Sequence, residues 1–458
     1  MQQKKTFLVL AVLLIGLAAF SYFYEYKGAP ERERLEDESK QLFKVKQDDV
    51  TQIVIENKNG RFVIKHEGEE WTLIEPVKAK ADANAAKDVV YALDTLRFSK
   101  KLEGNPNDLS PYGLSTPAIR VQLTTKSGEM GLKVGEKAPF GSDRYIQKEG
   151  DESVYLTSSY LGGKLDQDLL GFRDKRIIDL SIPEVRTIRI SGANVPGLEA
   201  RREGKDWFSA DDPPLKLDRT RVEGILYGLE GLRTQQFTGQ TDPSLYNLDP
   251  PALTVELEIG DDKTKKTLYF GPPTGDQKRL PVVRAKGEEI RLVDGSILDK
   301  LGKSAKDLRD TQVVRFSKSA LDKIVATVED HAITARRKDD TWKIEGGSGD
   351  ALAPSDIDAI VEDLRQLKAT DFFDDVPSDT LARYGLDSPS VHIELFESKD
   401  SSPLKIDLGQ PTSASEGPAY ARVNEGTTVY QLSRYILEDI HDVLVKPKAH
   451  DATPTPGG

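Results

Sequence analysis

Residue types that carry out chemistry are present in this chain, but few of them stand at spacings that a reaction would use. The histidines are His66, His331, His392, His441 and His450. No pair of them has the H-E-x-x-H spacing or another metal-ligand spacing. The chain has no cysteine, which excludes disulfides, thiolate metal sites and a thiol nucleophile. We therefore expect no metal and no cofactor, and surface positions for the histidines.

Three short segments resemble parts of chemical motifs. Gly302-Lys303-Ser304 resembles the end of a phosphate-binding loop, but Ile297 stands where that motif needs its first glycine. The glycines at 346–349 lack the strand-then-helix context of a dinucleotide loop. The acidic run Asp371–Asp375 could supply paired carboxylates for glycoside hydrolysis, although a solvated acidic loop is favoured. The sequence thus predicts no catalytic, cofactor-binding or metal-binding residues, and a protein that is not an enzyme.

The N-terminus has the pattern of a membrane anchor. Lys4 and Lys5 precede an apolar run that begins at Phe7 and ends with the aromatic residues Tyr22 and Tyr24. About 18 residues in a helix span a hydrocarbon core of roughly 30 Å, and the lysine flank stays in the cytoplasm. We expect a single-pass anchor in a bacterial inner membrane, with the bulk of the chain in the periplasm. A signal peptide cleaved near residues 19–21 is the alternative.

The three tryptophans indicate that the rest of the chain is repeated. Trp71, Trp207 and Trp342 are separated by 136 and 135 residues (207 − 71 and 342 − 207), each in a strand-like setting. Twenty-two residues after each Trp comes a Leu, with a second Leu three residues later, a spacing that predicts one face of an amphipathic helix. These pairs are Leu93 and Leu96, Leu229 and Leu232, and Leu364 and Leu367.

Acidic and hydroxyl residues mark where these helices should begin. Asp82 and Asp218 each lie eleven residues after their Trp and are predicted N-caps. Ala353 holds the same place in the third copy. There we expect Ser355 to be the N-cap, with Asp358 three positions on.

A Tyr-x-Leu turn follows each helix. Its tyrosines are Tyr112, Tyr246 and Tyr384, and Gly or Asn at the centre predicts a residue with φ > 0. A proline and an alternating strand come next. The following strand is expected to end at a glycine, which is Gly135, Gly271 or Gly409. Two more strands and a short closing helix complete each copy, the helices around 158–165, 295–301 and 433–443.

The predicted fold class is α+β: an N-terminal transmembrane helix, then three tandem modules of mostly antiparallel sheet with packed helices. The predicted boundaries are a lysine flank and anchor at 1–26, a charged stalk or short helix at 27–42, module 1 at 43–181, module 2 at 182–317, module 3 at 318–445, and a disordered tail at 446–458. Repeated Arg-Asp segments with no flexible linker around them (Arg173-Asp174 and Arg309-Asp310) predict that the modules touch.

The ordered set of Trp, paired Leu, Tyr-Gly-Leu, Pro and Leu-x-x-Gly resembles the domain-of-unknown-function 4340 (DUF4340) family. The resemblance covers roughly residues 43–445, and module 2 departs from it with Asn247 for Gly and Val283 near the positions of Tyr145 and Tyr420. The resemblance implies an N-terminal anchor, tandem modules and an ABC transporter of the gliding-motility type as partner. It supplies no catalytic residues.

Composition limits the classes of partner. The 458 residues are 37% apolar and 31% charged, with a net charge of −12. An acidic chain is repelled by phosphate backbones, so we expect no nucleic-acid partner. The leading expectation is a non-enzymatic, membrane-anchored periplasmic accessory or scaffold protein that contacts the bilayer and membrane transporter subunits. A periplasmic ligand- or glycan-binding module is the second reading, and a hydrolase that uses acidic residues is the third.

Overall fold

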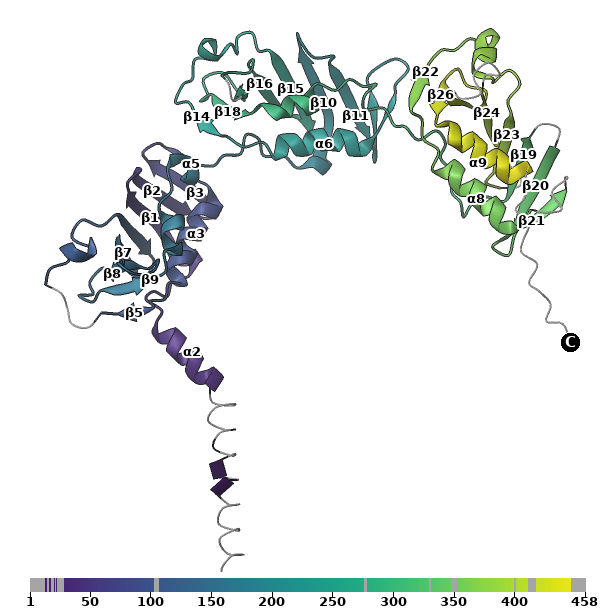
Figure 1. Cartoon of the computed structure of the whole chain (residues 1–458). Coiled ribbons are helices and arrows are strands. Elements are labelled where there is room, and N and C mark those ends of the chain that lie inside the picture. The colour runs from purple at the N-terminus through teal and green to yellow at the C-terminus, as the bar shows by residue number, and fades with distance from the viewer. Residues whose placement is uncertain are drawn as a thin grey trace, which may run out of the picture. The chain divides into compact units, whose positions relative to one another are not determined.

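The computed structural model is built around three antiparallel sheets (Figure 1). The structure describes residues 13–14, 16–17, 20, 22, 29–102, 107–275, 278–328, 331–346, 352–398, 401–410 and 417–445. Within these residues the sheets have nine, nine and eight strands, one sheet for each predicted module. The expected α+β class and the three tandem modules are therefore confirmed.

Module 1 consists of two meanders that join through their first strands. Its main strands are β1 (Val50–Asn57), β2 (Gly60–Glu67), β3 (Glu70–Glu75), β6 (Ile119–Thr125), β7 (Gly128–Lys137), β8 (Arg144–Lys148) and β9 (Tyr155–Thr157). The sheet order β4-β3-β2-β1-β6-β7-β8-β9-β5 places β6 beside β1, although α3 (Ala83–Asp94) separates them in sequence. Short edge strands β4 (Ala79–Lys80) and β5 (Lys100–Lys101), and helices α4 (Tyr160–Leu165) and α5 (Leu169–Phe172), complete the module.

Modules 2 and 3 repeat this plan and sheet order. Module 2 contains β10 (Val185–Gly192), β11 (Leu198–Glu203), β12 (Asp206–Ser209), β13 (Lys216–Leu217), α6 (Arg219–Glu230), β14 (Gln236–Phe237), β15 (Leu253–Ile259), β16 (Thr264–Phe270), β17 (Arg279–Val283), β18 (Arg291–Asp294) and α7 (Leu298–Leu301). Module 3 contains β19 (Lys323–Val328), β20 (His331–Lys338), β21 (Thr341–Gly346), α8 (Pro354–Arg365), β22 (Asp371–Phe373), β23 (Val391–Phe396), β24 (Leu404–Gly409), β25 (Ala419–Val423), β26 (Val429–Leu432) and α9 (Arg434–Val445).

Each core lies between one sheet face and the helix that follows the first meander, and in module 3 the equally long α9 also contributes to the core. Strand residues alternate between buried and exposed, as β15 shows with burial at every second position. The three tryptophans are buried, with exposed fractions of 2%, 0% and 4% for Trp71, Trp207 and Trp342. In module 1, Trp71 and the helix residue Leu93 belong to one apolar cluster. Complete burial of a side chain such as Leu93 contributes about 2 kcal/mol.

The repeated glycines allow a turn to pack against a strand. Gly113, Asn247 and Gly385 have φ of 65°, 52° and 66°, so the predicted left-handed turn position is confirmed. The carbonyl of the turn tyrosine, or of its neighbour Gly385, occupies the space that a Cβ would take at Gly135, Gly271 or Gly409. These glycines are therefore needed for close approach. Gly135 lies inside β7, which continues to Lys137, so the expected strand end is wrong for module 1.

The predicted helices end earlier than the leucine spacing suggested. α3 ends at Asp94, so Leu96 follows the helix, and Leu232 and Leu367 follow α6 and α8 in the same way. These leucines are still buried. The Ser355 N-cap is also wrong, because Ala353 is the N-cap and the carboxylate of Asp356 accepts a hydrogen bond from its backbone N–H. Asp358 instead accepts a hydrogen bond from Nε1 of Trp342 at 3.3 Å.

The segment before module 1 includes the helix α2 (Ala29–Ser39), which agrees with the expected stalk or short helix. Lys4, Lys5, Phe7 and Tyr24 lie outside the described residues, as does the predicted tail at 446–458. Tyr22 is described and 50% exposed. Within the described part of the chain, no helix combines the length and hydropathy that a membrane span requires.

Candidate functional site at the module junctions

The junction between modules 1 and 2 is a short strand-like segment that pairs with both modules. On the module 1 side, the N–H of Asp174 donates to the carbonyl of Lys80, and the N–H of Asp82 donates to the carbonyl of Phe172, both at 2.9 Å. On the module 2 side, the N–H of Thr234 donates to the carbonyl of Lys175 at 2.7 Å. Consecutive residues thus change partner from one module to the next without a free linker.

The next junction repeats this pairing at equivalent positions. The N–H of Asp310 donates to the carbonyl of Lys216 at 2.9 Å, and the N–H of Asp218 donates to the carbonyl of Leu308 at 2.7 Å. The N–H of Ala369 in module 3 donates to the carbonyl of Thr311 at 2.7 Å. Both predicted contacts between successive modules are therefore present.

An arginine in each junction segment reaches an aromatic ring and a carboxylate of the following module. The Arg173 guanidinium lies 3.9 Å from the ring centroid of Phe237 and 2.5 Å from Oε2 of Glu289. The Arg309 guanidinium lies 4.0 Å from the ring centroid of Phe372 and donates to both carboxylate oxygens of Asp374, at 2.7 and 3.0 Å. Both arginine side chains are largely buried, with 12% and 13% exposure.

Partial burial strengthens these contacts. A cation over an aromatic face contributes about 0.5–2 kcal/mol, more as the pair loses water. Hydrogen bonds from Arg309 lower the pKa of Asp374, and the hydroxyl of Thr428 donates to the same carboxylate at 2.9 Å. Asp374 therefore forms a specific ion pair, while its side chain remains 38% exposed to solvent.

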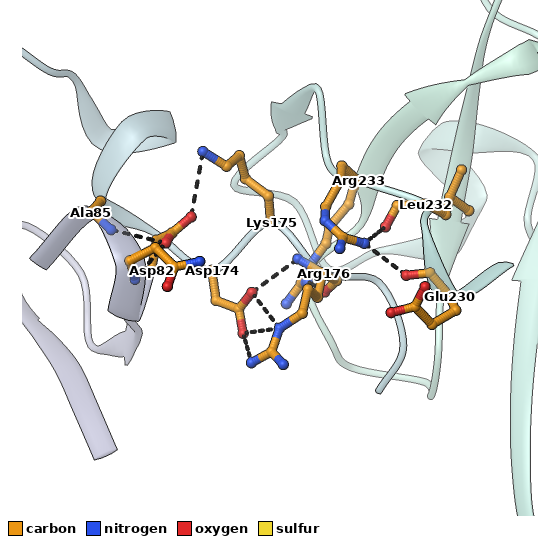
Figure 2. Close-up of polar contacts among 10 residues, drawn as sticks. Asp82, Ala85, Asp174, Lys175, Arg176, Glu230, Leu232 and Arg233 are labelled. Carbon is orange, nitrogen blue, oxygen red and sulfur yellow. Dashed lines mark hydrogen bonds and ion pairs between the residues drawn. The ribbon is translucent and has the colours of Figure 1, made fainter. Parts of the chain in front are cut away.

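A pocket of about 250 Å³ lies at the first junction (Figure 2). Asp82 caps α3 by accepting from the N–H groups of Asn84 and Ala85, and it lies 3.6 Å from Nζ of Lys175. The Asp82 cap was predicted, and it is confirmed. Residues 83–84, Asp174, Arg176 and Arg233 complete the pocket wall.

The charged side chains in this pocket all have hydrogen-bond or ion-pair partners within the protein. Arg176 donates from Nε and Nη2 to Asp174 at 2.9–3.2 Å. Burial alone would raise the pKa of Asp174, but hydrogen bonds from the side chain and backbone of Arg176 outweigh it and lower that pKa. Arg233 donates to the backbone carbonyls of Glu230 and Leu232, as Figure 2 shows. The pocket therefore holds a paired electrostatic network.

The second junction has a pocket of about 520 Å³ in the corresponding place. Its wall includes Asp218, Asp310 and Lys368, which match Asp82, Asp174 and Arg233 of the first pocket. The carboxylate of Asp218 accepts from the N–H of Arg221 at 3.1 Å, so the predicted cap on α6 is confirmed. Asp310 pairs with the guanidinium of Arg315. A pocket therefore occurs at both junctions, while the polar side chains around it differ.

The helix caps Asp82 and Asp218 and the junction residues Asp174 and Asp310 line these pockets. The tryptophans, paired leucines, turn tyrosines and repeated glycines that the sequence singled out lie in the cores and turns. In modules 1 and 3 the turn tyrosine contacts a strand tyrosine edge to face, with Tyr112–Tyr145 and Tyr384–Tyr420 centroids 4.9 and 5.0 Å apart. In module 2, Tyr246 packs instead against a cluster that includes Val283. Pro281 occupies the position equivalent to Tyr145, because Pro281 pairs with Leu292 as Tyr145 pairs with Leu156.

The histidines and glycine motifs form no reactive group in the described residues. The His66 ring stacks on Trp71 at 4.1 Å, and Nδ1 of His392 lies 2.6 Å from Oδ1 of Asp407. No cluster of metal-ligating side chains occurs among the residues that the structure describes. Gly302 follows the end of α7, whereas a phosphate loop would precede a helix. His450 and residues 347–349 lie outside the described residues.

Sequence reasoning identified the junction arginines only as part of a repeated join, and it missed their aromatic partners. A signal was available, because the position thirty residues after each Trp holds Lys101 in module 1 but Phe237 and Phe372 in modules 2 and 3. The phenylalanine is thus present in the two modules that follow another module, and absent from the first.

The family comparison agrees with the repeat. A family described as "Domain of unknown function (DUF4340)" matches residues 71–251, 245–380 and 342–444. The chain belongs to the DUF4340 family. The first and third matched segments begin at Trp71 and Trp342, within the first meander of their modules, so the matched segments are offset from the sheets.

Other comparisons add little to the DUF4340 assignment. A putative DNA polymerase III beta subunit from Eubacterium rectale ATCC 33656 is 9% identical over 86% of this chain and 94% of its own, with a TM-score of 0.13. A similarity this low supports no inference. The search of curated proteins finds no match.

Proposed function

We propose that this chain is a non-enzymatic, membrane-anchored accessory or scaffold protein of the periplasm that partners an ABC-type transporter complex. The observation that carries this proposal is the repeated junction, in which paired backbone and an arginine–phenylalanine–carboxylate contact join one module to the next. Tandem modules joined without free linkers offer a long succession of surfaces to protein partners.

The distribution of recurring residues supports a binding role. The features common to all three modules are buried tryptophans, buried leucines and tightly packed turns. Polar residues at equivalent junction positions vary, as Lys175 and Arg176 correspond to Thr311 and Gln312. A reaction shared by the modules would need the opposite pattern.

The proposed anchor rests on the sequence. Lys4 and Lys5 before the apolar run from Phe7 to Tyr24 predict insertion with the lysines in the cytoplasm. An inner-membrane location would place the modules beside membrane transporter subunits, the partner class that the family resemblance implies.

Affinity purification from native membranes tests the proposal. The full-length protein would be extracted in several mild detergents, and mass spectrometry would identify co-purifying proteins and the N-terminus of the chain itself. Recovery of an ABC-transporter permease with residues 1–26 retained is the expected result. Purification of the protein alone in every detergent, with an N-terminus processed near Tyr22, would contradict it.

A periplasmic ligand-binding module is the second candidate, favoured by the two junction pockets of about 250 and 520 Å³. Pockets of this size accept small ligands, usually through a few convergent polar groups. Here the carboxylates are occupied by Lys175, Arg176 and Arg315, so a ligand would have to displace existing ion pairs. The scaffold role is therefore preferred for the junctions.

The acidic hydrolase has less support. Asp82 and Asp174 line one pocket, as such an enzyme would need. However, Asp82 caps a helix, and the lowered pKa of Asp174 keeps that carboxyl ionised near neutral pH, which is unsuited to a general acid.

A further inference from the structure

A groove in module 1 has the features of a ligand site, and it shares no residue with either junction pocket. It has a volume of about 300 Å³ and runs between α3 and α4. Its apolar wall includes Ala92, Leu96 and Leu161, which are 5–9% exposed. Tyr91 and Tyr160 also line it and are 67% and 73% exposed, so two aromatic side chains face solvent beside an apolar wall.

Polar groups surround this apolar wall. Asp88 and Lys164 form an ion pair of 2.6 Å between the two helices. Thr95, Arg97 and Ser158 add two hydroxyls and a guanidinium to the lining. The Arg97 guanidinium donates to the carbonyl of Thr95 at 3.0 Å and presents further N–H groups.

Module 2 provides an internal comparison, because its fold is the same but the groove residues differ. Gly224 and Ser296 stand 136 positions after Asp88 and Tyr160, so the ion pair and the second tyrosine are absent there. Lys300, which corresponds to Lys164, lies so close over Gly228 that a Cβ on this glycine would be 2.8 Å from Cδ of the lysine. The exposed Tyr227 remains at the place of Tyr91.

The fold of the module does not require Asp88 and Tyr160. Module 2 forms its sheet and helices without Asp88 or Tyr160, so the folding of the module does not explain these residues. An exposed tyrosine has no core to cover, and two of them on one groove increase the apolar surface in contact with water. A ligand that covers both rings would remove this surface from water.

The chemistry of the groove selects the class of ligand. A pyranose ring has flat faces of C–H groups, which pack on an aromatic ring, and a rim of hydroxyls, which need hydrogen-bonding partners when they lose water. The groove presents tyrosine rings and an apolar wall for the faces. For the rim it presents further N–H groups of Arg97 and the hydroxyl oxygens of Thr95 and Ser158. We propose that the α3–α4 groove of module 1 binds the sugar rings of an oligosaccharide.

This site would give the chain a binding activity in addition to the scaffold role, and it does not depend on that role. Binding would be measured by titration calorimetry on the full-length protein in mild detergent, without a transporter. The probes are tetraacetylchitotetraose, which is neutral, and tetragalacturonic acid, whose carboxylates could pair with Arg97. A proline-rich peptide is the competing probe, because aromatic grooves also bind such peptides.

Tyr91→Ala and Tyr160→Ala should each weaken sugar binding about three- to tenfold, which corresponds to the loss of roughly 0.7–1.4 kcal/mol, the size of one aromatic ring contact. Tyr227→Ala is the matched control, because it removes an exposed tyrosine from the same helix position of module 2, and it should leave the affinity unchanged. Circular dichroism would verify that all three variants remain folded.

The preferred probe identifies the class of sugar. Tighter binding of the chitotetraose indicates a neutral amino sugar, and tighter binding of the galacturonate indicates an acidic one. Both results support the site. If neither sugar binds with a Kd smaller than roughly 10 mM, the proposal is overturned, because a larger Kd would mean binding of only about 2.7 kcal/mol. Equal losses from the Tyr91, Tyr160 and Tyr227 variants, or binding of the peptide alone, would also overturn it.

Discussion

At the residue scale, three glycines explain why the Tyr-x-Leu turn recurs. The turn backbone lies directly over Gly135, Gly271 and Gly409, and a side chain at these positions would collide with a carbonyl oxygen. The cause is close backbone packing, because none of the three has a positive φ. The strand and the turn therefore specify one another, although 23 to 25 residues separate the turn tyrosine from the glycine (135 − 112, 271 − 246 and 409 − 384).

Gly135→Ala should destabilise module 1 by about 1–3 kcal/mol, because the new methyl group forces the turn and β7 apart. Hydrogen exchange of the amides in β6 and β7 would measure the loss within module 1 alone. Gly163→Ala in α4 is the matched control, since no atom lies within 4 Å of its Cβ position. Equal protection in the Gly135 variant and the wild type would show that the turn can move away at no cost.

Sequence reasoning found these glycines but not their purpose. The central glycine of the turn was predicted correctly, because a left-handed residue is a local property that Gly or Asn reveals. Gly135 was expected to end its strand, whereas it lies inside β7. Position 135 must lack a side chain because the backbone carbonyl of Tyr112 lies where a Cβ would be. This contact is tertiary, so no local sequence pattern reveals it.

At the element scale, the helices that follow the first meander of each module differ in how they begin. Asp82 and Asp218 accept hydrogen bonds from the first turn of α3 and α6. Ala353 has no side chain that can do so at the start of α8, although its φ of −91° and ψ of 157° suit an N-cap. Module 3 therefore lacks one favourable contact that the other modules have.

Ala353→Ser should stabilise module 3 by about 0.5–1 kcal/mol, because the hydroxyl can accept from the first turn while Asp356 still accepts from the backbone of residue 353. Hydrogen exchange of α8 would measure the gain. Ala359→Ser, within the same helix, should give no gain. A result in which both serines act alike would refute the capping explanation.

The elements most visible in the sequence were long ones with clear periodicity, and the missed ones were short. The strands of both meanders follow from alternation, and α3, α6 and α8 follow from leucine spacing. Two-residue edge strands such as β4, β5, β13 and β14 are too short to show a period. They form because the junction segments and neighbouring strands supply their hydrogen bonds, which is a tertiary cause.

The junction contact of Asp374 predicts a dependence on pH. Its pKa is held below the ordinary 3.8 by Arg309, so its stabilisation is fully present above 3.8 and is lost as pH falls through the lowered value. Asp374→Asn should therefore lower the stability of module 3 at neutral pH and have little effect in strong acid. Urea unfolding at several pH values would measure this, and a pH-independent loss would contradict the assignment.

At the scale of the whole molecule, the same kind of contact recurs at both junctions. Arg173 and Arg309 each carry a ring contact and an ion pair into the following module. Arg309→Ala should raise the rate of protease cleavage around residue 310 several-fold, because it removes both contacts from a partly buried site. Arg383→Ala, an exposed arginine of module 3, is the control and should not change the cleavage rate.

The three-module plan was predictable as a whole because one period repeats across the chain. Trp71, Trp207 and Trp342 gave that period, and the family match extends over the same region. The role of Phe237 and Phe372 was not predicted, because a phenylalanine after a helix is normally assigned to the core of its own module. Only the position of Arg173 and Arg309 in space identifies their shared purpose.

Co-purification of a transporter with junction variants would show whether the joined modules bind a membrane partner. The wild-type chain, the Arg173→Ala/Arg309→Ala double variant and the Arg383→Ala control would each be purified from native membranes at equal expression. The scaffold account predicts that an ABC-transporter permease is recovered with the wild type and the control, and that recovery falls several-fold with the double variant. Recovery of no membrane partner with any of the three proteins would contradict the account.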